Sequence, residues 1–118
     1  MAGRATFIAL TPLVPTGPAP LAEALAFYRD QLGFAVTWQS DTMAGLQRGA
    51  VTLNLVVNNE PQWLANASFS IGADDLDALF GEYRHVPARI GPLEMKPWGR
   101  REFHMIVPSG VCLQFYQA

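Results

Sequence analysis

Short stretches in which apolar and polar residues alternate run along most of the chain and predict β-strands. In the clearest of them, Val111, Leu113 and Phe115 alternate with more polar residues. Successive side chains of a strand point to opposite faces, so one face of this strand is apolar and the other is mixed. The turn residues Pro108-Ser109-Gly110 precede it and predict a hairpin with a strand over Glu102 to Ile106. A mixed face of this kind can line a pocket.

The same patterns predict strands and helices in a regular order. The predicted strands are Thr6 to Leu13, Phe34 to Gln39, Met43 to Arg48, Val51 to Val57, Ala67 to Ala73, Ile90 to Met95, Glu102 to Ile106 and Val111 to Tyr116. One helix begins near Pro20 or Leu21 and ends at Gly33, and the other is capped by Asp74 or Asp75 and ends before Pro87. The resulting order, βαβββ–βαβββ, predicts an α+β fold. Its two curved, mixed sheets would carry helices on the outside and leave a concave pocket.

The two halves of the chain are faintly similar to each other. Val51 to Leu55 has the pattern of Val111 to Phe115, and an amphipathic segment lies upstream of each. A polar break over Asn58 to Pro61 joins the halves. We therefore predict one domain over residues 1–118, with repeat halves of about 1–60 and 61–118. Half of the residues are hydrophobic, which is enough to build a core and to leave an apolar pocket.

Composition narrows the possible partners. The net charge is −2 and the chain has no run of Lys or Arg, so we expect no nucleic-acid partner. No apolar run approaches the ~20 residues of a membrane span, so no membrane partner is expected. The single cysteine, Cys112, cannot form an internal disulfide, which fits a reducing cytoplasm.

Three motifs carry a family resemblance: FYRDQLGF over Phe27 to Phe34, DDLDAL over Asp74 to Leu79, and PWGRREF over Pro97 to Phe103. With them the sequence resembles the vicinal oxygen chelate superfamily, which comprises the glyoxalase, bleomycin-resistance and dioxygenase proteins. The segment around Trp38, the segment Met43 to Gly49 and the PWGRREF run make it most similar to the bleomycin-resistance proteins. The resemblance implies a homodimer that binds and sequesters an antibiotic-like, bleomycin-type molecule in pockets between the chains.

The resemblance also places the positions at which metal enzymes of this superfamily carry ligands. These positions lie near Ala9 to Thr11, at Asn54, near Ala67 to Phe69, and at Gln114. Divalent metals require carboxylates or neutral imidazoles, whereas neutral amides stand at two of these positions and no histidine stands at the others. We therefore expect no metal, no cofactor and no catalytic residue.

Ligand-binding residues follow from the same resemblance. Bleomycin-resistance proteins hold the flat part of the drug between two aromatic residues, and the matching positions are Trp38 and Trp98. Stacking on an indole contributes about 0.5–1.5 kcal/mol beyond area burial. The polar residues predicted to orient the ligand are Asn54, Gln114, Ser70 and His104. The expected partner is a planar molecule that is hydrophobic or cationic.

Other interpretations of these residues stay open. Trp38 could instead fill the core or a dimer interface, and His104 could lie on the surface. Glu94 and Glu102 are expected on a solvated surface. A rival function is a metal-dependent lyase, isomerase or dioxygenase that uses His104 and Gln114 as unusual ligands. A third is a scaffold domain with a degenerate pocket.

Overall fold

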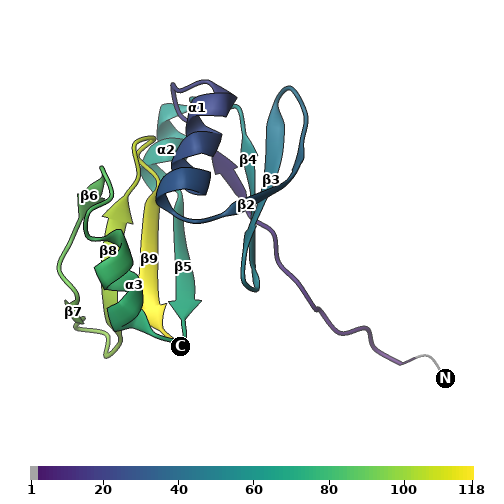
Figure 1. Cartoon of the computed structure of the whole chain (residues 1–118). Coiled ribbons are helices and arrows are strands. Elements are labelled where there is room, and N and C mark those ends of the chain that lie inside the picture. The colour runs from purple at the N-terminus through teal and green to yellow at the C-terminus, as the bar shows by residue number, and fades with distance from the viewer. Residues whose placement is uncertain (1–2) are drawn as a thin grey trace.

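The computed structural model describes residues 3–118, which form two mixed β-sheets (Figure 1). Sheet A contains, in spatial order, β1 (Leu13–Pro15), β4 (Val51–Val56), β3 (Met43–Arg48) and β2 (Ala35–Gln39). Sheet B contains β5 (Ser68–Ala73), β9 (Cys112–Gln117), β8 (Arg101–Ile106) and β6 (Arg89–Ile90), and β7 (Glu94–Met95) also pairs with β8. β1 runs parallel to β4 and β5 parallel to β9, whereas the other pairs are antiparallel. The α+β class and the two mixed sheets predicted from the sequence are confirmed.

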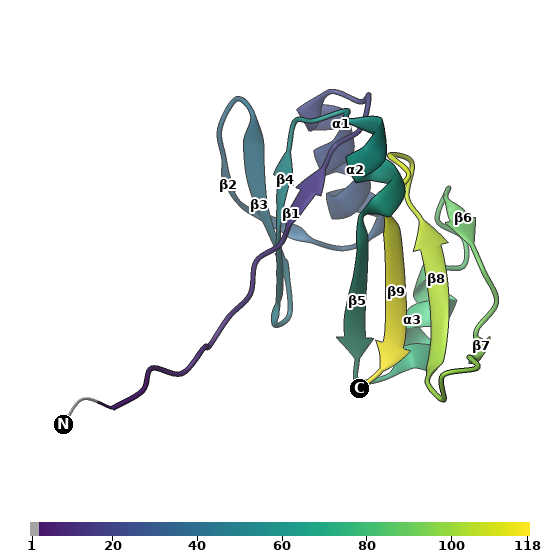
Figure 2. The same ribbon diagram turned by 180° about the vertical axis from the view of Figure 1, so that it is seen from behind.

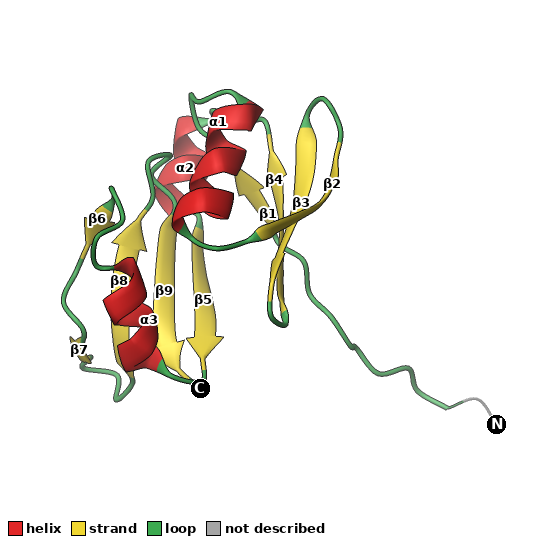
Figure 3. Cartoon of the chain, in the orientation of Figure 1, coloured by secondary structure: helices red, strands yellow, loops and turns green. Residues whose placement is uncertain are grey.

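One helix packs against each sheet (Figure 3). α1 (Leu21–Ala26) continues as a π-helical turn over Phe27–Gln31 and contacts β3 and β4. The chain leaves this turn at Gly33, which has φ +80° and ends the helix as predicted. α3 (Leu76–Tyr83) contacts β9 and begins at Asp75, whose carboxylate accepts the N–H of Ala78. We call the face opposite α1 in sheet A, and opposite α3 in sheet B, the open face of that sheet.

Alternation along the strands separates the core from the open faces. In β8 and β9 the buried side chains Phe103, Met105, Leu113 and Phe115 lie on the side of α3. The two phenylalanine rings pack closely, with the Phe103 and Phe115 centroids 5.0 Å apart. The intervening residues point to the open face, which is seen from behind the molecule in Figure 2.

Arg48, at the end of β3, connects the two halves of the chain. Its Nη1 donates to the carbonyl of Leu32 at 2.9 Å, to the hydroxyl of Tyr83 at 2.8 Å and to the carboxylate of Glu82 at 2.6 Å. Tyr83 donates its own hydroxyl hydrogen to the Leu32 carbonyl at 2.6 Å. Leu32 belongs to the first half and α3 to the second. One guanidinium therefore ties α3 to the end of the first helical segment.

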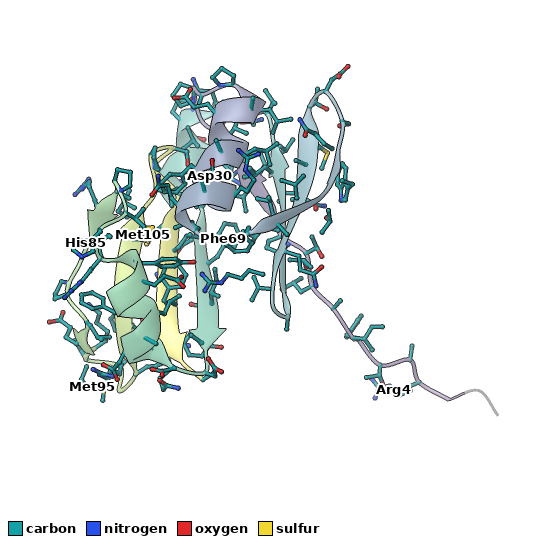
Figure 4. All side chains as sticks on the ribbon, in the orientation of Figure 1. Arg4, Asp30, Phe69, His85, Met95 and Met105 are labelled. Carbon is teal, nitrogen blue, oxygen red and sulfur yellow. The ribbon has the colours of Figure 1, made fainter. Side chains whose placement is uncertain are left out.

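The predicted first strand, Thr6 to Leu13, is wrong in its bounds, because β1 spans only Leu13–Pro15. Residues 3–12 form an extended arm whose outer part leaves the body of the molecule, with Arg4 far out on it (Figure 4). Leu10, Thr11 and Pro12, at its inner end, hydrogen-bond to Thr52 and Asn54 of β4. The apolar pattern of this segment is real, but a strand forms only where a neighbouring backbone pairs with it. The described pairing partners of β1 on β4 begin at Asn54.

Two further elements differ from prediction. Pro61–Asn66 forms a short helix, α2, that was not predicted and that follows the polar break over Asn58 to Pro61. Pro61 stands in its first turn, where a missing N–H costs nothing, and Glu60 caps it by accepting the N–H of Gln62. The predicted strand Ile90 to Met95 is split into β6 and β7. Pro92 lies in the gap and cannot donate a ladder hydrogen bond.

No helix within residues 3–118 combines the length and the apolar character that crossing a membrane requires.

Candidate ligand-binding site

A connected group of polar and aromatic side chains covers the open face of sheet B. The residues of this group are Ser68, Ser70, Trp98, Arg100, Glu102, His104, Gln114 and Tyr116. The register explains why they meet, since β8 and β9 place Glu102 opposite Tyr116 and His104 opposite Gln114. β5 places Ser70 beside Gln114.

Glu102 lies at the centre of this group and is completely buried. Its Oε2 accepts the indole N–H of Trp98 at 2.9 Å and the Nε–H of Arg100 at 2.5 Å, and its Oε1 lies 2.7 Å from Nε2 of His104. The expectation of a solvated surface position for Glu102 was wrong. Three donors replace water around the carboxylate, which makes its burial tolerable.

The charge of Glu102 is preserved by these partners. Burial raises the pKa of the carboxyl group, but the hydrogen bonds from Trp98, His104 and Arg100 outweigh this effect and lower the pKa from 4.5 to about 2. At neutral pH the group is a carboxylate, which can only accept hydrogen bonds. The hydrogen between Glu102 and His104 is therefore carried by Nε2 of His104.

Trp98 is the most exposed aromatic side chain of this face. It lies in a tight turn in which Gly99 adopts φ +87° and donates its N–H to the carbonyl of Lys96 at 2.9 Å. The indole is 61% exposed and stacks on the imidazole of His104, with centroids 6.3 Å apart and planes inclined by 18°. Its accessible surface is available to a flat ligand.

Tyr116 and Arg100 form a second stack beside the first. The guanidinium carbon of Arg100 lies 4.0 Å from the centroid of the Tyr116 ring, and Nη2 of Arg100 donates to the hydroxyl of Ser70 at 3.2 Å. The ring lies over Gly72 on β5, where an added Cβ would come within 2.9 Å of it. The absence of a side chain at Gly72 makes room for the tyrosine.

Gln114 and Ser70 are held by each other and by their neighbours. The amide nitrogen of Gln114 donates to the hydroxyl of Ser68 at 2.9 Å, and the amide oxygen accepts from Ser70 at 3.3 Å. These bonds fix the orientation of the Gln114 amide without a ligand. Within residues 3–118 no group of three or more His, Cys, Asp or Glu side chains is placed to hold a metal ion.

Trp38 lies on the open face of sheet A. Ala44 and Leu46 on β3 point into the core, so a Cβ on Gly45 would point to the open face. There it would lie only 2.2 Å from Nε1 of Trp38, so the indole lies directly over the glycine backbone. A bulge in the β2–β3 pairing next to Trp38 accompanies this arrangement. Trp38 is 45% exposed, which excludes the core position considered from sequence.

Asn54 neighbours Trp38 on the same face. β4 pairs Asn54 with Gly45, the residue beneath the Trp38 indole. Asn54 also pairs with Leu13 of β1, which is 48% exposed. The structure thus brings two of the predicted residues together on sheet A.

The six predicted residues divide into two groups in one chain. Trp38 and Asn54 belong to sheet A, whereas Trp98, His104, Gln114 and Ser70 belong to sheet B. None of the six lines a cavity of about 620 Å³ between α1, the proline-rich loop Pro15 to Pro20 and the β8–β9 turn. The buried hydroxyl of Tyr28, another residue lining this cavity, makes no hydrogen bond with the described residues.

Sequence reasoning missed Glu102, Arg100 and Tyr116. Alternation with the buried Phe103 placed Glu102 on the face of His104, and this signal was present in the sequence. The contact between Glu102 and the Trp98 indole could not be predicted from the sequence, because it depends on how the turn at Gly99 folds back. The positions of Arg100 and Tyr116 depend on pairing across β8 and β9.

The fold matches those of several solved proteins. A bleomycin-binding protein from bleomycin-producing Streptomyces verticillus, complexed with copper(II)-bleomycin, superimposes with a TM-score of 0.85 at 24% identity, covering 98% of this chain and 99% of that one. A bleomycin resistance determinant encoded on the transposon Tn5 gives 0.79 at 23% identity, covering 94% and 98%. Lactoylglutathione lyase from Agrobacterium tumefaciens gives 0.74 at 16% identity, covering 98% and 96%. At these identities the likeness establishes the fold alone.

The family is established by sequence. No curated protein matches the chain. The family model described as the Glyoxalase/Bleomycin resistance protein/Dioxygenase superfamily matches residues 19–115, which is most of the chain. The match includes α1, α2 and α3, all strands from β2 to β8 and most of β9. The chain belongs to the Glyoxalase/Bleomycin resistance protein/Dioxygenase superfamily.

Proposed function

We propose that this protein binds a planar, bleomycin-type small molecule in the cytoplasm and sequesters it without a metal, a cofactor or a chemical step. The observation that carries the proposal is the pair of exposed indoles, Trp38 and Trp98, one on the open face of each sheet. Large aromatic side chains that stay exposed on a shaped face are typical of binding sites. Neither is needed to fill the core.

The chemistry of the two faces fits stacking better than bond cleavage. Each indole offers a flat apolar surface that contributes about 0.5–1.5 kcal/mol beyond area burial when a planar ring stacks on it. Asn54 and Gln114 would orient polar groups at the edge of the ligand. Ser70 and His104 hold their neighbours in place, since both are engaged in hydrogen bonds within the face.

The choice of a bleomycin-type ligand draws on the comparisons. Two of the similar structures are described as a bleomycin-binding protein and a bleomycin resistance determinant. The fold also occurs in lactoylglutathione lyase, so the fold alone does not decide between binding and catalysis. The exposed indoles favour binding.

We also propose that two copies form a homodimer. The arm carries three large apolar side chains, Phe7, Ile8 and Leu10, that are at least 83% exposed in the single chain. Such a concentration of apolar surface on an extended segment favours a protein partner. A second copy of the same chain is the partner we propose, because most soluble oligomers are homo-oligomers. The two indoles lie on different sheets of one chain, so a dimer that joins sheet A of one copy to sheet B of the other would enclose a ligand between them.

The dimer depends on the arm. Replacing Phe7 and Ile8 by Ser should convert a species of twice 12.9 kDa into a monomer, because the apolar contacts of the arm are lost. Sedimentation velocity over a range of concentrations measures this change. Arg4→Ser is the matched control on the same arm and should remain dimeric. A wild-type protein that sediments as a monomer at all concentrations would contradict the proposal.

Loss of the exposed indole of Trp98 should weaken binding. Trp98→Ala is expected to bind bleomycin about 10- to 100-fold less tightly, because both the stacking and the apolar area are lost. Isothermal titration calorimetry measures the affinity, and thermal unfolding checks that the variant is folded. Met95→Ala removes another exposed apolar side chain from the preceding segment and should bind as the wild type does. Equal affinities for Trp98→Ala and wild type would refute the role of Trp98.

A further inference from the structure

Glu102 connects the exposed indole to the rest of the face, and we propose that it is a positioning residue for the ligand platform. Its two oxygens face different rings: Oε2 accepts the indole N–H of Trp98 and Oε1 faces Nε2 of His104. One buried carboxylate therefore aligns both rings as the nearly parallel pair that the ligand would meet. This inference rests on the proposed function, since the platform matters only if a ligand stacks there.

Trp98 needs such a restraint because little else holds it. The indole is 61% exposed and stands in a turn of which Gly99, with φ +87°, is part. An exposed side chain with free rotamers would lose that freedom when a ligand binds, and the loss would reduce affinity. The hydrogen bond from Nε1 to Glu102, at 2.9 Å, fixes the ring before the ligand arrives.

His104 supplies the second ring of the platform. Because Glu102 is a carboxylate, Nε2 of His104 must carry the hydrogen between them, and this bond fixes the orientation of the imidazole ring. The imidazole then supports the indole with the planes inclined by 18°. The two nearly parallel rings, with centroids 6.3 Å apart, are thus held by one carboxylate.

Arg100 keeps the carboxylate ionised and in place. Its Nε donates to the same Oε2 that accepts from Trp98, and its position is fixed by the Tyr116 ring and by Ser70. The Arg100–Glu102 pair also offsets the buried negative charge. The platform therefore presents aromatic surface to a ligand rather than a bare carboxylate.

A double-mutant cycle distinguishes positioning from general stabilisation. Glu102→Gln should weaken bleomycin binding about tenfold in the wild-type background, a loss of ~1.4 kcal/mol. In the Trp98→Ala background the same change should alter affinity less than about twofold, because the ring it orients is gone. Glu94→Gln, which removes one exposed charge from the neighbouring strand, should bind as the wild type does in both backgrounds. Equal losses in the two backgrounds would overturn the proposal.

A measurement without ligand separates failure of this inference from failure of the proposed function. In an ¹H–¹⁵N correlation spectrum, the indole N–H signal of Trp98 is assigned from its disappearance in Trp98→Ala. Glu102→Gln should shift this signal and weaken the cross-relaxation between the Trp98 and His104 rings, whereas Glu94→Gln should leave both unchanged. An unmoved signal would refute positioning by Glu102. If the signal moves but wild-type protein binds no bleomycin, the positioning stands and the proposed ligand is wrong.

Discussion

Glu102→Gln is expected to unfold more readily than wild type at pH 7, and the difference in stability between the two proteins should narrow as the pH falls toward 2. The carboxylate is buried and accepts three hydrogen bonds from Trp98, Arg100 and His104. A glutamine keeps the shape but offers one acceptor oxygen and an NH₂ group that faces other donors. The loss of charge-assisted bonds should lower the free energy of unfolding by about 3 kcal/mol at neutral pH.

The direction of the pH dependence follows from the pKa. Because the folded pKa of Glu102, about 2, lies below its ordinary value of 4.5, the carboxylate stabilises the fold fully above pH 4.5. This contribution is lost as the pH falls from 4.5 toward 2. Urea unfolding at several pH values measures it. Glu94→Gln carries the same charge change on an exposed residue, so its free energy of unfolding should depend on pH as that of the wild type does. A stability difference independent of pH across this window would contradict the assignment.

We expect Arg48→Met to lose about 3 kcal/mol of unfolding free energy, because two partly buried acceptors lose a charged donor. The acceptors are the Leu32 carbonyl and the Tyr83 hydroxyl, which tie the first half of the chain to α3. Methionine preserves the apolar stem, so the change reports on the guanidinium rather than on packing. The guanidinium also lies 5.6 Å from the centroid of the Tyr83 ring.

A second arginine provides the control for this prediction. Arg29 pairs with its neighbour Asp30 in an exposed position, so Arg29→Met should leave the stability nearly unchanged. Urea unfolding monitored by far-ultraviolet circular dichroism compares the two variants. If Arg48→Met is as stable as Arg29→Met, Arg48 does not join the two halves as described.

The alternation of apolar and polar residues predicted most strands, because successive side chains of a pleated strand point to opposite faces. Met43 to Arg48 agrees with β3 at both ends, and the strand Glu102 to Ile106 begins one residue later than β8. The pattern failed for Thr6 to Leu13, where apolar residues cover no core of their own chain. A strand pattern indicates that one face of a segment is apolar, but it does not say what covers that face.

The candidate site could be predicted only in part. The two indoles, Trp38 and Trp98, were identified from motifs, and the structure gives each an exposed position on an open face. The residues that contact these indoles could not be predicted. The position of the Trp38 indole over Gly45, for example, depends on how β2 pairs with β3. The burial of Glu102 likewise depends on three donors that converge from the turn and from β8. From sequence alone a charged residue is predicted to be exposed, because the partners that would allow its burial are not known.

Titration of the wild-type protein with bleomycin, followed by recovery of the drug, tests the central claim most directly. Isothermal titration calorimetry in the presence of a metal chelator should give saturable binding with one drug molecule per chain, because each dimer would contain two equivalent sites. Mass spectrometry of the recovered drug should show the starting mass, as expected for sequestration. No binding, or a drug recovered with an altered mass, would contradict the claim.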